Sequence, residues 1–137
     1  MGWLIAMFVK KIIEENAAKE NGESEKDCTE LVQVKKAIEK LDGEGKTATV
    51  LRNDEKNFML VGGGLNGKYI VLACLKGKMY AATNKYAVPK DSIELTVNGK
   101  KETYPSKRCL NLEMVLEAAK HYADRGALAQ VFDWERP

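Results

Sequence analysis

The sequence contains few of the residues that usually carry out chemistry, with one histidine and three cysteines in 137 residues. Cys28, Cys74 and Cys109 are widely spaced and form no Cys-x-x-Cys pair, which argues against a disulfide framework or a zinc site and favours a reducing, cytoplasmic compartment. His121 lies in the charged middle of a predicted helix, where a lone histidine is usually solvated. We therefore expect a protein that is not an enzyme and that has no catalytic residue, metal or cofactor.

Long hydrophobic runs and a strong excess of one charge are also missing. Residues 1–9 are apolar, but this run is well short of the ~20 residues that span a bilayer. Its lysines follow it, which is the wrong order for a signal peptide. The formal net charge of +2 is too small to indicate nucleic-acid binding by itself. We expect neither a membrane nor nucleic acid as the direct partner.

Two other functional classes stay open at this point. Lysines of the second half of the chain cluster near predicted turns, so a small nucleic-acid-associated regulatory module is the alternative. An enzyme that uses Cys109 or His121 is a third hypothesis.

Two amphipathic helices are predicted from apolar residues at three-and-four spacing. The later helix starts at Leu112, after Asn111, which can cap its first free amides, and ends at Gly126. The earlier helix is predicted to have Thr29 or Asp27 as its cap and Gly43 as its stop. Its apolar face is formed by Leu31, Val34, Ile38 and Leu41.

The region before the first helix has a less regular pattern. The apolar stretch from Trp3 to Ile13 has neither clean helical nor clean alternating periodicity, so it is predicted to be a buried strand, with a helix as the competing interpretation. The stretch from Asn16 to Asp27 is polar and contains Gly22 and Ser24. It predicts a flexible connection or a frayed end.

From Lys46 onward, short β-type runs separated by turn residues predict an antiparallel sheet. The Asn98-Gly99 pair is typical of a type I′ hairpin turn. Gly62-Gly63-Gly64 indicates a hairpin turn, or instead a place where a partner comes close to the backbone. The predicted strands are Thr47–Arg52, Phe58–Val61, Lys68–Leu75, Met79–Ala82, Ile93–Val97, Lys101–Tyr104 and Gln130–Trp134.

These elements predict one α+β domain over residues 1–137. It has an antiparallel β-sheet of five to seven strands that is covered by two main α-helices. Within it, residues 1–27 form an N-terminal extension, or a first strand plus a polar linker.

The second half of the chain carries four short motifs in a fixed order. They are Phe58–Gly63 in an early strand, Ile93–Gly99 in a hairpin, Tyr104-Pro105 after it, and a helix, a glycine and a strand that ends at Trp134. Together with the helix from Leu31 to Leu41, they resemble the first-numbered Imm family of immunity proteins from bacterial polymorphic toxin systems. The resemblance implies an α+β protein that binds and neutralises a cognate toxin domain, often a nucleic-acid deaminase or nuclease.

Such a protein is expected to present carboxylates to its partner, because toxins that act on nucleic acid have basic clefts. The acidic candidates are Asp54 and Glu55 in the first hairpin turn, Asp133 and Glu135 near the end, and the run Glu20, Glu23 and Glu25. The aromatic candidates are Trp134, Tyr80 and Tyr86. Trp134 has the alternative role of closing the core, and each carboxylate the alternative of ordinary solvated charge. An exposed sheet edge would be free to pair with itself or with a partner.

Overall fold

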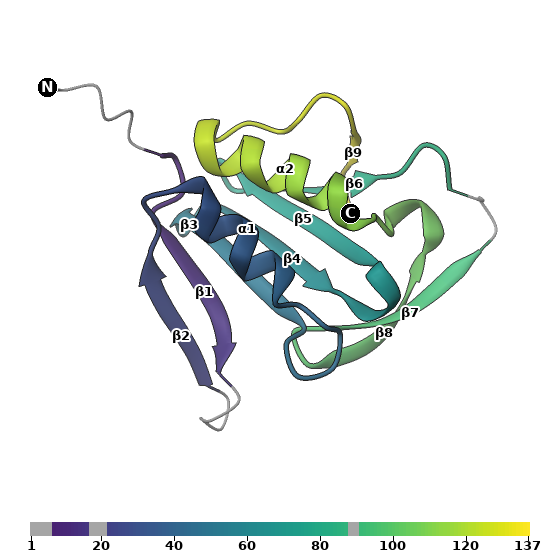
Figure 1. The fold of residues 1–137 in the computed structure, drawn as a ribbon. Coiled ribbons are helices and arrows are strands. Elements are labelled where there is room, and N and C mark those ends of the chain that lie inside the picture. Colours follow the sequence, from purple (N-terminus) through teal and green to yellow (C-terminus); the bar gives the residue numbers. More distant parts are fainter. Residues whose placement is uncertain (1–6, 17–21, 88–90) are drawn as a thin grey trace, which may run out of the picture.

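The fold is built around a seven-stranded sheet in which every pair of neighbouring strands is antiparallel (Figure 1). The computed structural model describes residues 7–16, 22–87 and 91–137. The strand order is β2-β1-β3-β4-β5-β6-β9, and β7 and β8 form a separate two-stranded sheet. The strands are β1 (Lys11–Asn16), β2 (Gly22–Asp27), β3 (Ala48–Asp54), β4 (Asn57–Gly63), β5 (Tyr69–Leu75), β6 (Lys78–Thr83), β7 (Ser92–Val97), β8 (Lys100–Pro105) and β9 (Asp133–Glu135). The predicted α+β class is confirmed.

Both helices, α1 (Leu31–Glu39) and α2 (Leu112–Arg125), cover the same face of the large sheet (Figure 1). Ile38 of α1 and Val115 of α2 are fully buried and belong to one apolar cluster with residues of β1, β3, β4 and β5. Tyr122 of α2 is also fully buried, and its phenol donates a 2.7 Å hydrogen bond to the carbonyl of Cys74. The core therefore lies between the helices and the sheet. Among the described residues, no helix combines the length and apolar character needed to cross a membrane.

The ends of α2 are as predicted, whereas those of α1 are not. The side chain of Asn111 accepts a hydrogen bond from the amide of Met114, and Gly126 adopts a left-handed conformation with φ 66°. At α1 the N-cap is Glu30 instead of Thr29 or Asp27, because the side-chain oxygen of Gln33 accepts the amide of Glu30 at 2.9 Å. The helix ends at Glu39, before Gly43, where Asp42 begins a tight turn.

The flexible connection predicted between Asn16 and Asp27 is contradicted for residues 22–27, while residues 17–21 lie outside the described residues. Residues 22–27 form β2, which pairs with β1 in register from Lys11–Asp27 to Asn16–Gly22. β2 is polar at every position, so it lacks the alternation of apolar and polar residues by which a strand is recognised. The predicted strand Trp3–Ile13 overlaps β1 only from Lys11; residues 1–6 lie outside the described residues.

The β7–β8 ribbon packs against the sheet face opposite the helices, where Leu95 and Val97 contact a second cluster that includes Ile70 and Cys109. Gly62 makes this approach possible, because a Cβ at that position would clash with Val97. A Cβ at Gly64 would likewise clash with the carbonyl oxygen of Leu41, which would lie 2.6 Å from it. Gly62 and Gly64 thus accommodate the protein's own chain. The turn predicted at Gly62-Gly63-Gly64 begins only at Gly64, because Gly62 and Gly63 still belong to β4 and pair with β5.

The last strand is shorter than predicted. It covers Asp133–Glu135 and not Gln130–Trp134, because the chain first makes a turn in which the amide of Phe132 donates to the carbonyl of Ala129. β9 then pairs with β6 as the second edge of the large sheet.

Candidate partner-binding surface

The candidate carboxylates of the first hairpin turn are both exposed, Asp54 at the end of β3 and Glu55 in the turn after it. Asp54 shapes the turn: its Oδ1 accepts hydrogen bonds from the amide of Lys56 (2.8 Å) and the side chain of Asn57 (2.9 Å). These donors hold the pKa of Asp54 below its usual value. Glu55 is exposed, forms no ion pair or side-chain hydrogen bond with any of the described residues, and shares a shallow depression with Lys56 and Lys76. Of this pair, Glu55 has the freer carboxylate.

The candidate carboxylates of β9 are neutralised within the chain. Asp133 is exposed and lies 3.9 Å from the ammonium of Lys85, and Glu135 lies 3.1 Å from that of Lys107. Both acids project from the sheet face opposite the helices, since Trp134 between them packs into the helix side. Exposed pairs of this kind are weak, but they reduce the local negative potential that would attract a basic partner.

Trp134 is half-buried and takes part in the core. Its indole N–H donates to the carbonyl of Ala129 at 2.9 Å, and its ring meets Phe132 edge-on at a centroid distance of 6.1 Å. Tyr80, on the neighbouring β6, lies under the guanidinium of Arg136 at 5.4 Å. The arrangement of Trp134 agrees with the core-closing alternative of the sequence analysis.

Tyr86 is the most exposed of the aromatic candidates, with 90% of its surface accessible. Its amide donates to the side chain of Asn84, which fixes the turn that follows β6. The preceding residue, Lys85, is the one that pairs with Asp133. The structure therefore gathers Tyr80, Asp133, Trp134 and Glu135 along the β6–β9 edge with Tyr86 next to it in sequence, and it places Asp54 and Glu55 at a separate turn.

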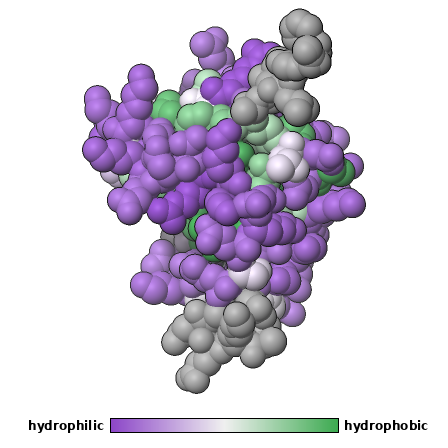
Figure 2. All heavy atoms as spheres, turned by 90° about the vertical axis from the view of Figure 1, so that its left-hand side faces the viewer, coloured by the Kyte–Doolittle hydropathy of each residue, from purple (hydrophilic) through white to green (hydrophobic). Residues whose placement is uncertain are grey.

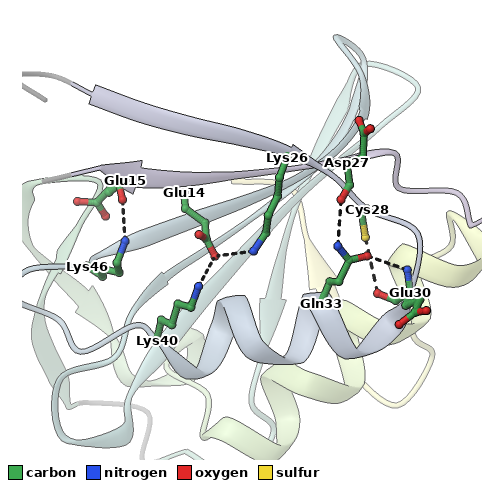
Figure 3. A network of polar contacts seen from close by, with 9 residues as sticks. All are labelled: Glu14, Glu15, Lys26, Asp27, Cys28, Glu30, Gln33, Lys40 and Lys46. Carbon is green, nitrogen blue, oxygen red and sulfur yellow. Dashed lines mark hydrogen bonds and ion pairs between the residues drawn. The ribbon is translucent and has the colours of Figure 1, made fainter. Parts of the chain in front are cut away.

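A polar network joins the β1–β2 hairpin to α1 (Figure 3). Glu14 of β1 is 8% exposed, and its Oε1 lies 3.8 Å from the ammonium of Lys26 on β2 and 3.7 Å from that of Lys40 after α1. Gln33 of α1 donates to the carbonyl of Asp27 at 3.1 Å. This network was not predicted from the sequence, although a glutamate next to the two isoleucines of β1 is a signal of a buried charge that needs partners.

The remaining acidic candidates lie on the hairpin that this network supports. Glu23 and Glu25 are exposed on β2, at the outer edge of the large sheet, and no ion pair among the described residues involves either one. Glu20 lies outside the described residues. Figure 2, which looks onto this side of the molecule, shows a largely hydrophilic surface.

The structure also places the cysteines and the histidine considered for the enzyme hypothesis. Cys28 and Cys109 are buried, and this burial raises the pKa of both thiols above the ordinary value, which disfavours the nucleophilic thiolate. His121 lines a shallow depression with charged residues of α2 and makes no hydrogen bond among the described residues. Within the same described ranges, His, Cys, Asp and Glu nowhere gather in a group of three or more that would hold a metal ion.

Comparison with known families decides between these possibilities. The family model described as immunity protein Imm1 matches residues 23–136. The chain belongs to the Imm1 family. The match extends from β2 to the residue after β9, so it includes both helices and all strands except β1. No curated protein matched the chain. As an Imm1 immunity protein it has a toxin protein as its partner, and immunity proteins generally act without catalysis.

Proposed function

We propose that this Imm1 protein neutralises a toxin that acts on nucleic acid, a deaminase or a nuclease, by forming a tight one-to-one complex in the cytoplasm. Membership of the Imm1 family supports this proposal most strongly. The shape of the molecule is consistent with it, because the chain presents a rigid sheet with exposed edges and has its thiols buried away from solvent. The protein inhibits by occupying a surface and needs no catalytic group of its own.

The chemistry of the substrate explains why carboxylates are the expected contacts. A toxin that binds DNA or RNA neutralises phosphates with lysine and arginine, so its cleft is basic. Carboxylates on the immunity protein speed association with such a cleft and compete with the phosphates. Asp54, Glu55, Asp133 and Glu135 are proposed contacts on this basis, together with the aromatic side chains of Tyr80, Tyr86 and Trp134. Glu55 and Tyr86 are the most accessible of them.

Growth rescue and direct binding test the proposal together. The toxin domain encoded beside this gene is expressed in a bacterial host with and without the protein, and the purified pair is measured by calorimetry. We expect restored growth and one-to-one binding. Inhibition of base conversion or of strand cleavage in vitro then identifies the toxin as a deaminase or a nuclease. A protein that neither protects cells nor binds the toxin contradicts the proposal.

A further inference from the structure

Strand β2 is an uncovered edge of the large sheet. It pairs with β1 on one side and has no neighbour on the other among the described residues (Figure 1). The five residues from Glu23 to Asp27 are all exposed. Natural proteins commonly protect such an edge with charged side chains, a proline, a bulge or a covering loop, and of these β2 has only the charges. β2 contains no proline, and its pairing with β1 is regular along its whole length.

The register shows which peptide groups face outward. The amide of Cys28 donates to the carbonyl of Lys10 at 2.8 Å, beside the pair Lys11–Asp27. Since hydrogen-bonded and non-hydrogen-bonded pairs alternate along an antiparallel ladder, Ser24 and Lys26 direct their peptide groups toward β1. The peptide groups of the alternate residues point away from the sheet; these are Glu23, Glu25 and Asp27.

The same three residues carry the negative charge of the edge. Lys26 is ion-paired with Glu14 beneath α1, so its side chain lies on the helix side of the sheet. Because successive side chains of a strand point to opposite faces, Glu23, Glu25 and Asp27 lie on the other face. Asp27 is paired with Lys11. Glu23 and Glu25 form no ion pair among the described residues. The open peptide groups are therefore flanked by two carboxylates that take part in no ion pair among the described residues.

The charge pattern disfavours a second copy of this chain as the occupant. When two β2 strands pair antiparallel about a two-fold axis perpendicular to the sheet, residues on the same face stand opposite one another. Each such register places carboxylates of Glu23, Glu25 and Asp27 against one another, and like charges directly opposite are destabilising. A strand with lysine or arginine at alternate positions avoids this repulsion. It can form hydrogen bonds with the outward peptide groups of β2 and ion pairs with its carboxylates.

The edge is also held in place before any partner arrives. The ion pairs from Glu14 to Lys26 and Lys40 join the hairpin to the end of α1, and the hydrogen bond from Gln33 to the carbonyl of Asp27 joins it to the start (Figure 3). A strand that is already ordered loses little conformational entropy on binding. The network thus acts as a support for β2, with Glu14 as a positioning residue.

We propose that β2 is the docking edge for the toxin: a cationic strand of the toxin pairs with it, extends the seven-stranded sheet and sets its lysine or arginine side chains against Glu23 and Glu25. This inference rests on the proposed function, because the occupant is the toxin of that proposal. It places the principal contact at the β1–β2 edge and not at the β6–β9 edge, where the carboxylates are already paired.

Two substitutions at one position separate the backbone contribution from the charge. Glu25→Ala removes the carboxylate, and Glu25→Pro also removes the outward N–H while leaving the ladder to β1 intact, since proline is tolerated on an edge strand when its N–H would face solvent. We expect the dissociation constant of the complex with the neighbouring-gene toxin domain to be about tenfold higher for the proline variant than for the alanine variant. Thermal unfolding of both free variants checks that the fold is kept.

Charge reversal with a matched control tests the electrostatic half. The double variant Glu23→Lys with Glu25→Lys has a formal net charge of +6 in place of +2. The control double variant, Glu44→Lys with Glu117→Lys, has the same net charge but carries its changes at exposed positions outside β2. The β2 pair is expected to slow association by about tenfold or more, and the control pair to have a much smaller effect.

Hydrogen exchange of the wild-type complex locates the contact independently of any variant. We expect the amides of Glu23, Glu25 and Asp27 to exchange more slowly in the complex than in the free protein. If the wild-type protein binds the toxin while these amides are unprotected and the β2 variants bind normally, the docking edge is refuted and the proposed function stands. If the wild-type protein does not bind the toxin, both are refuted.

Discussion

At the scale of single residues, Asp42 shows how a carboxylate can be structural where a sequence offers it as surface charge. Its Oδ1 accepts hydrogen bonds from the amides of Glu44 (2.8 Å), Gly45 (2.9 Å) and Lys46 (3.1 Å), and these lower its pKa from the ordinary 3.8. The amides satisfied by Asp42 form the turn between α1 and β3. Asp54 fulfils the same role at the β3–β4 turn.

The lowered pKa of Asp42 makes stability depend on pH in a defined direction. A carboxyl with a folded-state pKa below its unfolded value stabilises the fold above the unfolded value and loses that contribution as pH falls through the folded one. Asp42→Asn should therefore lower the urea midpoint at pH 6, and the difference from wild type should shrink at pH 3. Glu44→Gln, at an exposed position two residues further along, is the control and should show no such trend. An Asp42→Asn deficit that is equal at both pH values would contradict this account.

Trp134 has two alternative roles, in the core or in the interface, and these predict opposite effects of a substitution on stability and on toxin affinity. Trp134→Phe keeps an aromatic ring but removes the N–H that donates to Ala129, so we expect a loss of about 1 kcal/mol in the free energy of unfolding. If Trp134 serves only in the core, this substitution leaves the affinity for the toxin unchanged. A drop in affinity with full stability would instead identify Trp134 as an interface anchor. Denaturant titration and calorimetry on the same sample distinguish the two.

At the scale of elements, the β7–β8 ribbon is attached to the large sheet at two places. Gly62 lets Val97 pack onto β4, and the hydroxyl of Thr47 accepts the amide of Gly99 at 2.9 Å while donating to the carboxylate of Glu15 at 2.8 Å. The Glu15–Thr47–Gly99 chain links β1, the start of β3 and the turn of the ribbon. These contacts fix a hairpin that shares no ladder with the large sheet.

Adding one methyl group at Gly62 should test this packing. Gly62→Ala forces Val97 to shift and is expected to cost about 1–3 kcal/mol of stability. Gly45→Ala is the matched control, because the nearest atom to its Cβ position is 3.9 Å away. Adding Val97→Ala to Gly62→Ala should give a smaller loss than the two single losses combined. Strict additivity of the two losses would show that Gly62 and Val97 do not pack together.

The elements that could be predicted well from the sequence are those with a clear apolar periodicity or with typical cap and turn residues. The periodicity from Leu112 to Ala123, the cap at Asn111 and the stop at Gly126 mark α2 on both sides, and Asn98-Gly99 marks the β7–β8 turn. β2 was missed because every described side chain is exposed and its order comes from backbone pairing and from Glu14. The ion pairs of Asp133 and Glu135 join residues that are far apart in the chain, so no local pattern could predict them.

At the scale of the whole molecule, one apolar cluster connects both helices with β1, β3, β4, β5 and β6. We propose on this basis that residues 1–137 form a single domain, and we expect one cooperative unfolding transition. The ribbon has a smaller cluster of its own, but it shares Leu60 and Leu72 of the large sheet. Urea curves from far-ultraviolet and near-ultraviolet circular dichroism should coincide. A separate unfolding transition at lower urea concentration, shifted by a substitution in the ribbon such as Val97→Ala, would show that the chain has two folding units.

The distribution of charge over the whole molecule gives the last prediction. The formal net charge is +2, which by itself would repel a basic toxin. Residues 14–27, however, contain six carboxylates and two lysines, and the described part of this segment forms the β1–β2 edge. Attraction at close range is screened by salt over a Debye length of roughly 10 Å at 0.1 M, so local acidity should outweigh the net charge as the partners meet.

Association of the proposed complex should therefore slow as salt rises, although this protein has a formal net charge of +2. We expect the association rate constant from stopped-flow fluorescence to fall by about tenfold between roughly 0.02 M and 0.5 M NaCl, while the dissociation rate changes little. Glu23→Lys with Glu25→Lys should flatten or reverse this dependence, since it removes the source of attraction. If association instead accelerates with salt in the wild-type protein, net repulsion governs the encounter and the acidic edge does not steer it.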